Sequence, residues 1–115
     1  MKETANIKIE RNASNNISIS FSDCESLQDL KYTYVNQYLK QLITTRGTTM
    51  IFNMNGIHFI DNEIIDILNM LYRLGKKYNS NLVLKAVEPE VFEMINLAKK
   101  YYVFNVQHIE SISLS

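Results

Sequence analysis

One short stretch, GIHFIDNE, which spans residues 56–63, brings together residue types that could carry out acid–base chemistry. The stretch contains one histidine, His58, and one aspartate, Asp61, ahead of a strongly periodic apolar segment. A catalytic carboxylate needs a second acid, a positioned histidine or a metal as its partner. The other histidine, His108, lies far away near the C-terminus. We therefore expect Asp61 to be architectural, as the N-cap of the helix that follows it.

Other patterns that signal a reaction or a bound cofactor are missing from the sequence. There is no HxH, DxD or HExxH, no serine in a glycine-flanked elbow, and no GxGxxG or GxxxxGK after Asn53. The single cysteine, Cys24, stands between two acidic residues, which do not lower the pKa of its thiol. We expect His58 to be a loop residue hydrogen-bonded to backbone. The sequence thus predicts no catalytic residue, no bound metal and no cofactor.

Composition and charge limit the classes of function. The chain has 115 residues, 46% of them hydrophobic and 21% charged, which predicts one domain over residues 1–115. Twelve basic residues balance twelve acidic ones, so no overall field favours nucleic acid. No apolar run is long enough to cross a membrane, and the first ten residues, MKETANIKIE, lack the apolar core of a signal peptide. We expect a cytoplasmic protein.

The first half of the chain changes its hydrophobic period once. Alternation of apolar and polar residues predicts two strands, Asn6–Glu10 and Asn16–Ser22, joined as an antiparallel hairpin by turn-forming residues. A helical period then predicts one helix from Leu27 to about Arg46, capped by Asp23 or Ser26. Its predicted buried stripe consists of Leu27, Leu30, Tyr34, Tyr38 and Leu42, with Val35 and Leu39 beside them.

The second half alternates strands with single helices. Strands are predicted at Thr48–Met54 and Asn81–Val87, and helices after Asp61 and after Glu88, whose neighbour Pro89 suits a first helical turn. Two short terminal strands, YVFNV and IESISL, follow. The element order β-β-α-β-α-β-α-β predicts an α/β fold with a mixed sheet and helices mainly on one face. The predicted buried stripe of the helix after Asp61 consists of Ile64, Ile67, Leu68, Leu71, Leu74 and Tyr78.

The long segment MIFNMNGIHFIDNEIIDILNMLYRLGKKYNSNLVLKAVEPEVFEMINLAKKYYVFNV resembles the STAS domain, the fold of bacterial anti-sigma-factor antagonists. In that family the loop ends in an Asp-Ser-x-Gly motif at the start of the second helix. A partner anti-sigma kinase phosphorylates the serine and so switches partner binding off. On this resemblance Asp61 matches the family aspartate, Asn62 the phosphorylated serine, Glu63 the variable position and Ile64 the glycine.

This chain departs from the motif at its central position. Asn62 has no hydroxyl group to phosphorylate, and Glu63 adds a negative charge at the helix N-terminus, where a phosphate would otherwise lie. The resemblance therefore implies the STAS fold and a binding surface, without the phosphorylation switch. The surface it implies, which could instead be an ordinary solvated helix face, consists of His58, Asn62, Glu63, Asp66, Asn69, Met70 and Arg73.

Three functions are compatible with these observations. The first is a non-catalytic, STAS-like regulatory module of bacterial signal transduction, a monomer or a homodimer, that binds an anti-sigma factor or a kinase-like protein near Asn62. The second is the small STAS subunit of an ABC-type lipid-transport complex, docked on the transporter ATPase. The third is a small-molecule or nucleotide sensor that uses the loops at the carboxyl ends of its strands. An enzyme is the least supported class.

Overall fold

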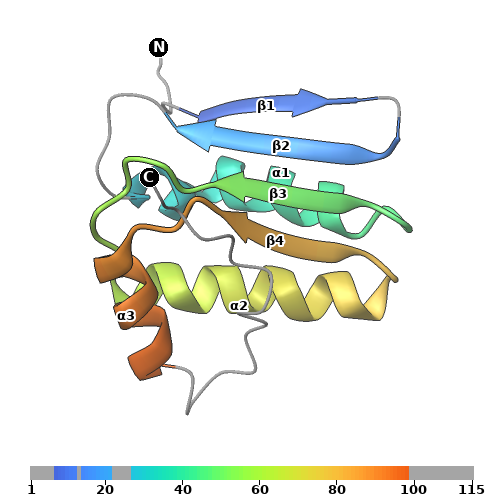
Figure 1. The fold of residues 1–115 in the computed structure, drawn as a ribbon. Coiled ribbons are helices and arrows are strands. Elements are labelled where there is room, and N and C mark those ends of the chain that lie inside the picture. The colour runs from blue at the N-terminus through green and yellow to red at the C-terminus, as the bar shows by residue number, and fades with distance from the viewer. Residues whose placement is uncertain (1–6, 13, 22–26, 99–115) are drawn as a thin grey trace.

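A computed structural model describes residues 7–12, 14–21 and 27–98 of the chain, and its fold is drawn in Figure 1. A mixed sheet contains four strands in the order β1-β2-β3-β4. Strands β1 and β2 are antiparallel, with Ile9 opposite Ile19, whereas β2, β3 and β4 run parallel. The predicted hairpin and mixed sheet are therefore confirmed. The strands are β1 (Ile7–Arg11), β2 (Asn16–Phe21), β3 (Thr49–Asn53) and β4 (Asn81–Lys85).

One 3₁₀ helix and three α-helices connect or follow these strands among the described residues. They are the 3₁₀ helix η1 (Gln28–Lys31), α1 (Thr33–Ile43), α2 (Asn62–Lys77) and α3 (Pro89–Ala98). Pro89 is the first residue of α3, where its missing N–H group costs no hydrogen bond. The two predicted terminal strands, and the caps Asp23 and Ser26, lie outside the described residues.

The prediction of one continuous helix from Leu27 is wrong. Tyr32 has an extended backbone, with φ −62° and ψ 133°, and separates η1 from α1. The interruption changes the helical phase, so Tyr34 and Tyr38 point outward and are 60% and 47% exposed. Val35 and Leu39 take the core-facing positions instead.

The core lies between one face of the sheet and the two crossover helices. In Figure 1, α1 lies behind the sheet and α2 runs beside β4. Apolar residues of both helices join the buried strand residues in one continuous cluster. This agrees with the prediction that the helices mainly cover one face. The strand residues in the cluster are Ile17, Ile19, Met50, Phe52, Leu82 and Leu84.

Close packing of α2 on α1 depends on Gly75. A Cβ atom at this position would lie 3.2 Å from Cγ1 of Ile43 and 3.2 Å from the carbonyl oxygen of Ser80. The N–H of Ser80 donates to the carbonyl of Gly75 at 2.6 Å, which fixes the start of the turn into β4. Tyr78, which was predicted to be buried, is instead exposed, because it follows the end of α2. Phe92, on the outer side of α3, is exposed as well.

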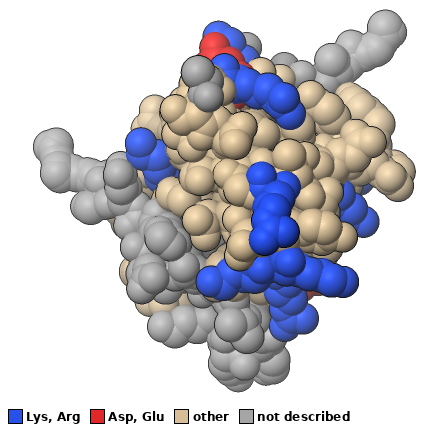
Figure 2. Space-filling model, turned by 90° about the vertical axis from the view of Figure 1, so that its right-hand side faces the viewer, with Lys and Arg blue, Asp and Glu red and all other residues tan. Residues whose placement is uncertain are grey.

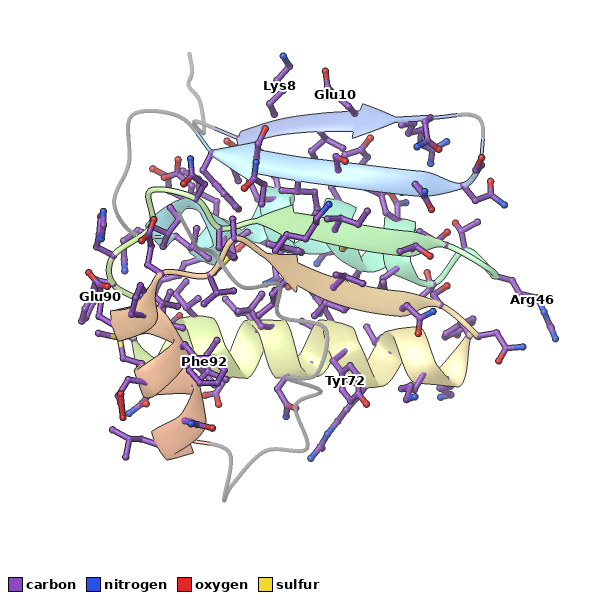
Figure 3. All side chains as sticks on the ribbon, in the orientation of Figure 1. Lys8, Glu10, Arg46, Tyr72, Glu90 and Phe92 are labelled. Carbon is purple, nitrogen blue, oxygen red and sulfur yellow. The ribbon has the colours of Figure 1, made fainter. Side chains whose placement is uncertain are left out.

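Charge is distributed unevenly between the two ends of the molecule. Figure 2 shows the end where the parallel strands begin, and Lys and Arg side chains dominate the charged residues on it. Arg46 projects from that end in Figure 3, whereas Glu90 lies at the opposite end. None of the described helices is both long and apolar enough to cross a membrane.

Candidate functional site

The loop between β3 and α2 is held firmly in place. The N–H of Met54 donates to the carbonyl of Lys85 at 2.8 Å, and the N–H of Ile57 donates back to Met54 at 3.0 Å. Gly56, at the turn, has φ +85°, a conformation that residues with a Cβ atom rarely adopt. Ile60, farther along the loop, is buried. The loop is therefore a rigid support for the side chains that leave it.

Asp61 occupies the N-cap of α2. Its backbone is extended, with φ −109° and ψ −179°, and its carboxylate accepts the N–H of Ile64 at 3.0 Å. Its carbonyl accepts the N–H of Ile65, also at 3.0 Å. The side chain of Asp61 thus provides a hydrogen-bond acceptor for one of the backbone N–H groups that have no partner within the first turn of the helix.

A cation from η1 completes the contacts of this cap. Nζ of Lys31 lies 2.7 Å from Oδ2 of Asp61 and 3.4 Å from Oε1 of Glu63. Nε2 of Gln28 donates to the same Asp61 oxygen at 3.4 Å. The hydrogen bond from Lys31, followed by that from the Ile64 N–H, lowers the pKa of Asp61 to about 2. Lys31 was not predicted from the sequence, because it lies thirty residues before its partner.

The residues predicted to form a binding surface on α2 do not all share one environment. Asn62, Glu63, Asp66 and Arg73 are exposed, and Met70 is half-buried. Asn69, however, is only 6% exposed, so the prediction that it lies on this outer surface is wrong. Positions 65, 69 and 72 follow one another at helical spacing, which turns Asn69 to the side of α2 occupied by buried Ile65.

A hollow lies beside Asn62, between the start of α2 and α3. Its volume is about 610 Å³, and most of its lining is apolar. Two large apolar side chains at its border are open to solvent: Phe59 is 49% exposed and Leu97 is 72% exposed. Periodicity could not predict this feature, because it joins a loop residue to the outer side of a helix. The residues that line the hollow are Phe59, Ile60, Asp61, Asn62, Ile65, Met94, Leu97 and Ala98.

His58 points to α3 and contacts its first turn. Nδ1 of His58 lies 2.9 Å from Oε2 of Glu90. The pKa of Glu90 is lowered, first by a hydrogen bond to its own backbone N–H and then by His58. Glu88, just before α3, accepts the N–H of Gly56 at 3.0 Å. The sequence did not indicate these carboxylates as neighbours of His58.

Comparison with known proteins gives a consistent picture of the fold. A family model described as STAS domain matches residues 9–111. The structure is similar to an anti-sigma-factor antagonist (STAS) domain protein from Planctomyces limnophilus, with a TM-score of 0.72, 14% sequence identity, and 95% of this chain and 92% of that chain covered. No curated protein matches the chain by sequence.

A second solved structure is similar over only a small part of its length. It is the murine Solute Carrier 26 family member A9 anion transporter in the inward-facing state, with a TM-score of 0.59 and 19% identity. The match covers 89% of this chain and 17% of the transporter. Both likenesses concern the fold.

Proposed function

This chain belongs to the STAS domain family, and on that premise we propose that it is a non-catalytic interaction module that binds a protein partner at the start of α2. The partner is an anti-sigma factor or a related kinase-like regulator in a bacterial cytoplasm. The observation that carries this proposal is the hollow beside Asn62, with Phe59 and Leu97 open to solvent at its border.

The surface at the start of α2 combines a hydrogen-bonded loop with exposed apolar side chains. Large apolar side chains that are open to solvent on a fixed support gain free energy when a partner covers them. The loop is tied to β4 through Met54, and the cap Asp61 fixes the first turn of α2. Little conformational entropy is therefore lost when this surface binds.

The chemistry of the first turn supports a module without a phosphorylation switch. Asn62 is exposed at the helix N-terminus, and its side chain is an amide. Incubation with an anti-sigma kinase and ATP should leave residues 57–67 unmodified, since they contain no serine, threonine or tyrosine. Peptide mass mapping after incubation tests this, and a phosphate in that span would contradict it.

The binding test compares substitutions inside and outside the hollow. Leu97→Ser and Phe59→Ser should each weaken partner binding by about 1–2 kcal/mol, roughly 5- to 30-fold. Tyr34→Ser is the matched control, since the exposed fraction of Tyr34, 60%, lies between those of Phe59 and Leu97 but Tyr34 belongs to α1. Asn62→Asp should also weaken binding, because it places a second charge beside Glu63.

The measurement has two stages. Partners are first recovered from the native host with the tagged chain and identified by mass spectrometry. The purified partner is then titrated against each variant by calorimetry, with circular dichroism to show that every variant is folded. Equal affinity of the Leu97→Ser, Phe59→Ser and wild-type proteins would refute the proposed site. Recovery of a transporter ATPase would assign the partner to the lipid-transport class instead.

One further substitution tests how far the binding surface extends along α2. Met70 is half-buried and Arg73 is exposed, and they lie about two and about three helical turns after Asn62. If the partner covers the helix beyond its first turn, Arg73→Ala should lose about 1–2 kcal/mol of affinity. An unchanged affinity would restrict the contact to the hollow and the first turn.

A further inference from the structure

Three potential metal ligands from two separate segments converge at the end of the molecule that carries the loop. His58 belongs to the loop after β3, Glu88 directly precedes α3, and Glu90 lies in the first turn of α3. One ligand atom of each lies within 4.8 Å of the ligand atoms of the other two. We propose that these three residues form a binding site for a divalent transition-metal ion such as Zn²⁺.

The distances are compatible with coordination after small side-chain movements. Zinc lies about 2.0–2.2 Å from nitrogen and oxygen ligands, so its ligand atoms are separated by about 3–4 Å. Nδ1 of His58 and Oε2 of Glu90 are already 2.9 Å apart. Both side chains are about half exposed, at 51% and 50%, so they can adjust without repacking the core.

The ligand chemistry selects the class of ion. One imidazole nitrogen with two carboxylates suits Zn²⁺ and its neighbours in the first transition row, whereas Mg²⁺ and Ca²⁺ prefer ligand sets made entirely of oxygen. Three protein ligands leave a coordination position for water or for a ligand from a partner. A divalent cation would also neutralise the two carboxylates of Glu88 and Glu90, which lie together at the start of one helix.

Two features of the surroundings prepare the ligands. The N–H of Gly56 donates to Oε2 of Glu88 at 3.0 Å, and such bonds orient a coordinating carboxylate. The contact between His58 and Glu90 joins the other two ligands across the two segments. His58, which the sequence predicted to be a loop residue hydrogen-bonded to backbone, contacts the carboxylate of Glu90 in the structure.

A bound ion would join the two walls of the hollow. Phe59 follows His58 in the loop, and Met94 and Leu97 lie farther along the helix that Glu90 begins. Coordination by ligands from both segments would hold the loop and α3 at a fixed separation. The binding of the ion itself does not depend on the proposed partner.

The test is calorimetric titration of the untagged full chain with ZnCl₂, with MgCl₂ as the comparison ion. Wild type should bind one equivalent of Zn²⁺, and Mg²⁺ should bind at least about tenfold more weakly. His58→Ala, Glu88→Gln and Glu90→Gln should each lower the Zn²⁺ affinity at least about tenfold. Two substitutions serve as controls: His108→Ala removes the other histidine, and Glu10→Gln removes an exposed carboxylate on β1.

A second measurement keeps the proposal testable if a variant folds poorly. In a ¹H–¹⁵N correlation spectrum of wild type, sub-equivalent Zn²⁺ should shift the amides of Gly56, His58 and Glu90 first. The proposal is overturned if wild type does not bind Zn²⁺, if any one of the three ligand variants keeps wild-type affinity, or if the first shifts arise elsewhere. Loss in all three variants, with both controls unchanged, would establish the site.

Discussion

Removal of the carboxylate at Asp61 should destabilise the domain through two separable effects. Asp61→Ala removes the acceptor for the Ile64 N–H at 3.0 Å and also the partner of Lys31 at 2.7 Å. Asp61→Asn keeps a side-chain oxygen that can cap the helix but removes the negative charge. Comparison of the two variants therefore distinguishes helix capping from charge pairing.

The magnitude follows from the geometry and the exposure of the group. Loss of the cap costs about 1 kcal/mol. A pKa lowered from 3.8 to about 2 corresponds to about 2.4 kcal/mol. Because the side chain is 33% exposed, solvent screening reduces the contribution of the charge to about 1 kcal/mol or less. We expect Asp61→Ala to lose about 1–2 kcal/mol, or about 4–8 °C in Tm, and Asp61→Asn about half of that.

The pH dependence gives an independent check. The folded pKa lies below the ordinary value of 3.8, so the charge of Asp61 stabilises the folded state above about pH 4. This contribution is lost as the pH falls towards about 2. The difference in unfolding free energy between wild type and Asp61→Asn should be constant from pH 7 to about pH 5 and shrink below about pH 4.

The assay is urea denaturation followed by circular dichroism at several pH values. Asp66→Ala is the control, because Asp66 is an exposed carboxylate one turn farther along α2 and should change stability by less than about 0.5 kcal/mol. Equal stability of Asp61→Ala and wild type would refute the capping role. A difference between wild type and Asp61→Asn that does not vary between pH 7 and pH 2 would refute the charge contribution.

Three other substitutions test the packing of the helices, all by thermal or urea denaturation. Gly75→Ala should lose about 1 kcal/mol, since its Cβ would press on Ile43 and on the backbone of Ser80; a gain in stability would contradict the close packing. Asn69→Leu should gain about 1 kcal/mol, because the buried Oδ1 of Asn69 has no hydrogen-bond partner among the described residues; a loss would show that this oxygen is needed. Tyr38→Ser should change stability by less than about 0.5 kcal/mol, whereas a loss of 2 kcal/mol or more would restore the predicted buried stripe.

Strong local signals predicted most of the fold correctly. The alternating segment before Phe21 and the helical stripe after Asp61 have one clear period each, and both correspond to elements in the structure. Pro89 correctly predicted the start of α3, because the proline ring is tolerated in the first turn of a helix but not in its interior. Helices and strands with a single unambiguous hydrophobic period can therefore be predicted from the sequence alone.

The errors share a physical cause. Tyr32 interrupts the helical period, but no proline or glycine marks the break in the sequence. The predicted buried stripe was therefore extended to Tyr34, which is exposed in the structure. Asn69 is polar but buried, because its position on α2 is set by the packing of neighbouring apolar residues. Hydrophobic patterning cannot reveal either effect, since tertiary packing decides both.

Residues distant in the sequence account for the missed parts of the site. Lys31 contacts Asp61 across thirty residues, and Glu90 contacts His58 across thirty-two. Neither pair has a local pattern, because the sheet crossovers bring the segments together. The hollow at Phe59 and Leu97 arises in the same way. The sequence identified the residues of the loop before α2, but only the three-dimensional structure shows which distant residues they contact.

The most direct test of the proposed binding site is site-specific photo-crosslinking. Benzoylphenylalanine replaces Phe59 at the hollow in one protein and Tyr34 on α1 in another, two aromatic positions that are 49% and 60% exposed. Each protein is illuminated with the purified partner, and the crosslinked product is quantified. We expect efficient crosslinking from position 59 and only background from position 34. Crosslinking from position 34, with none from position 59, would contradict it and place the partner on α1.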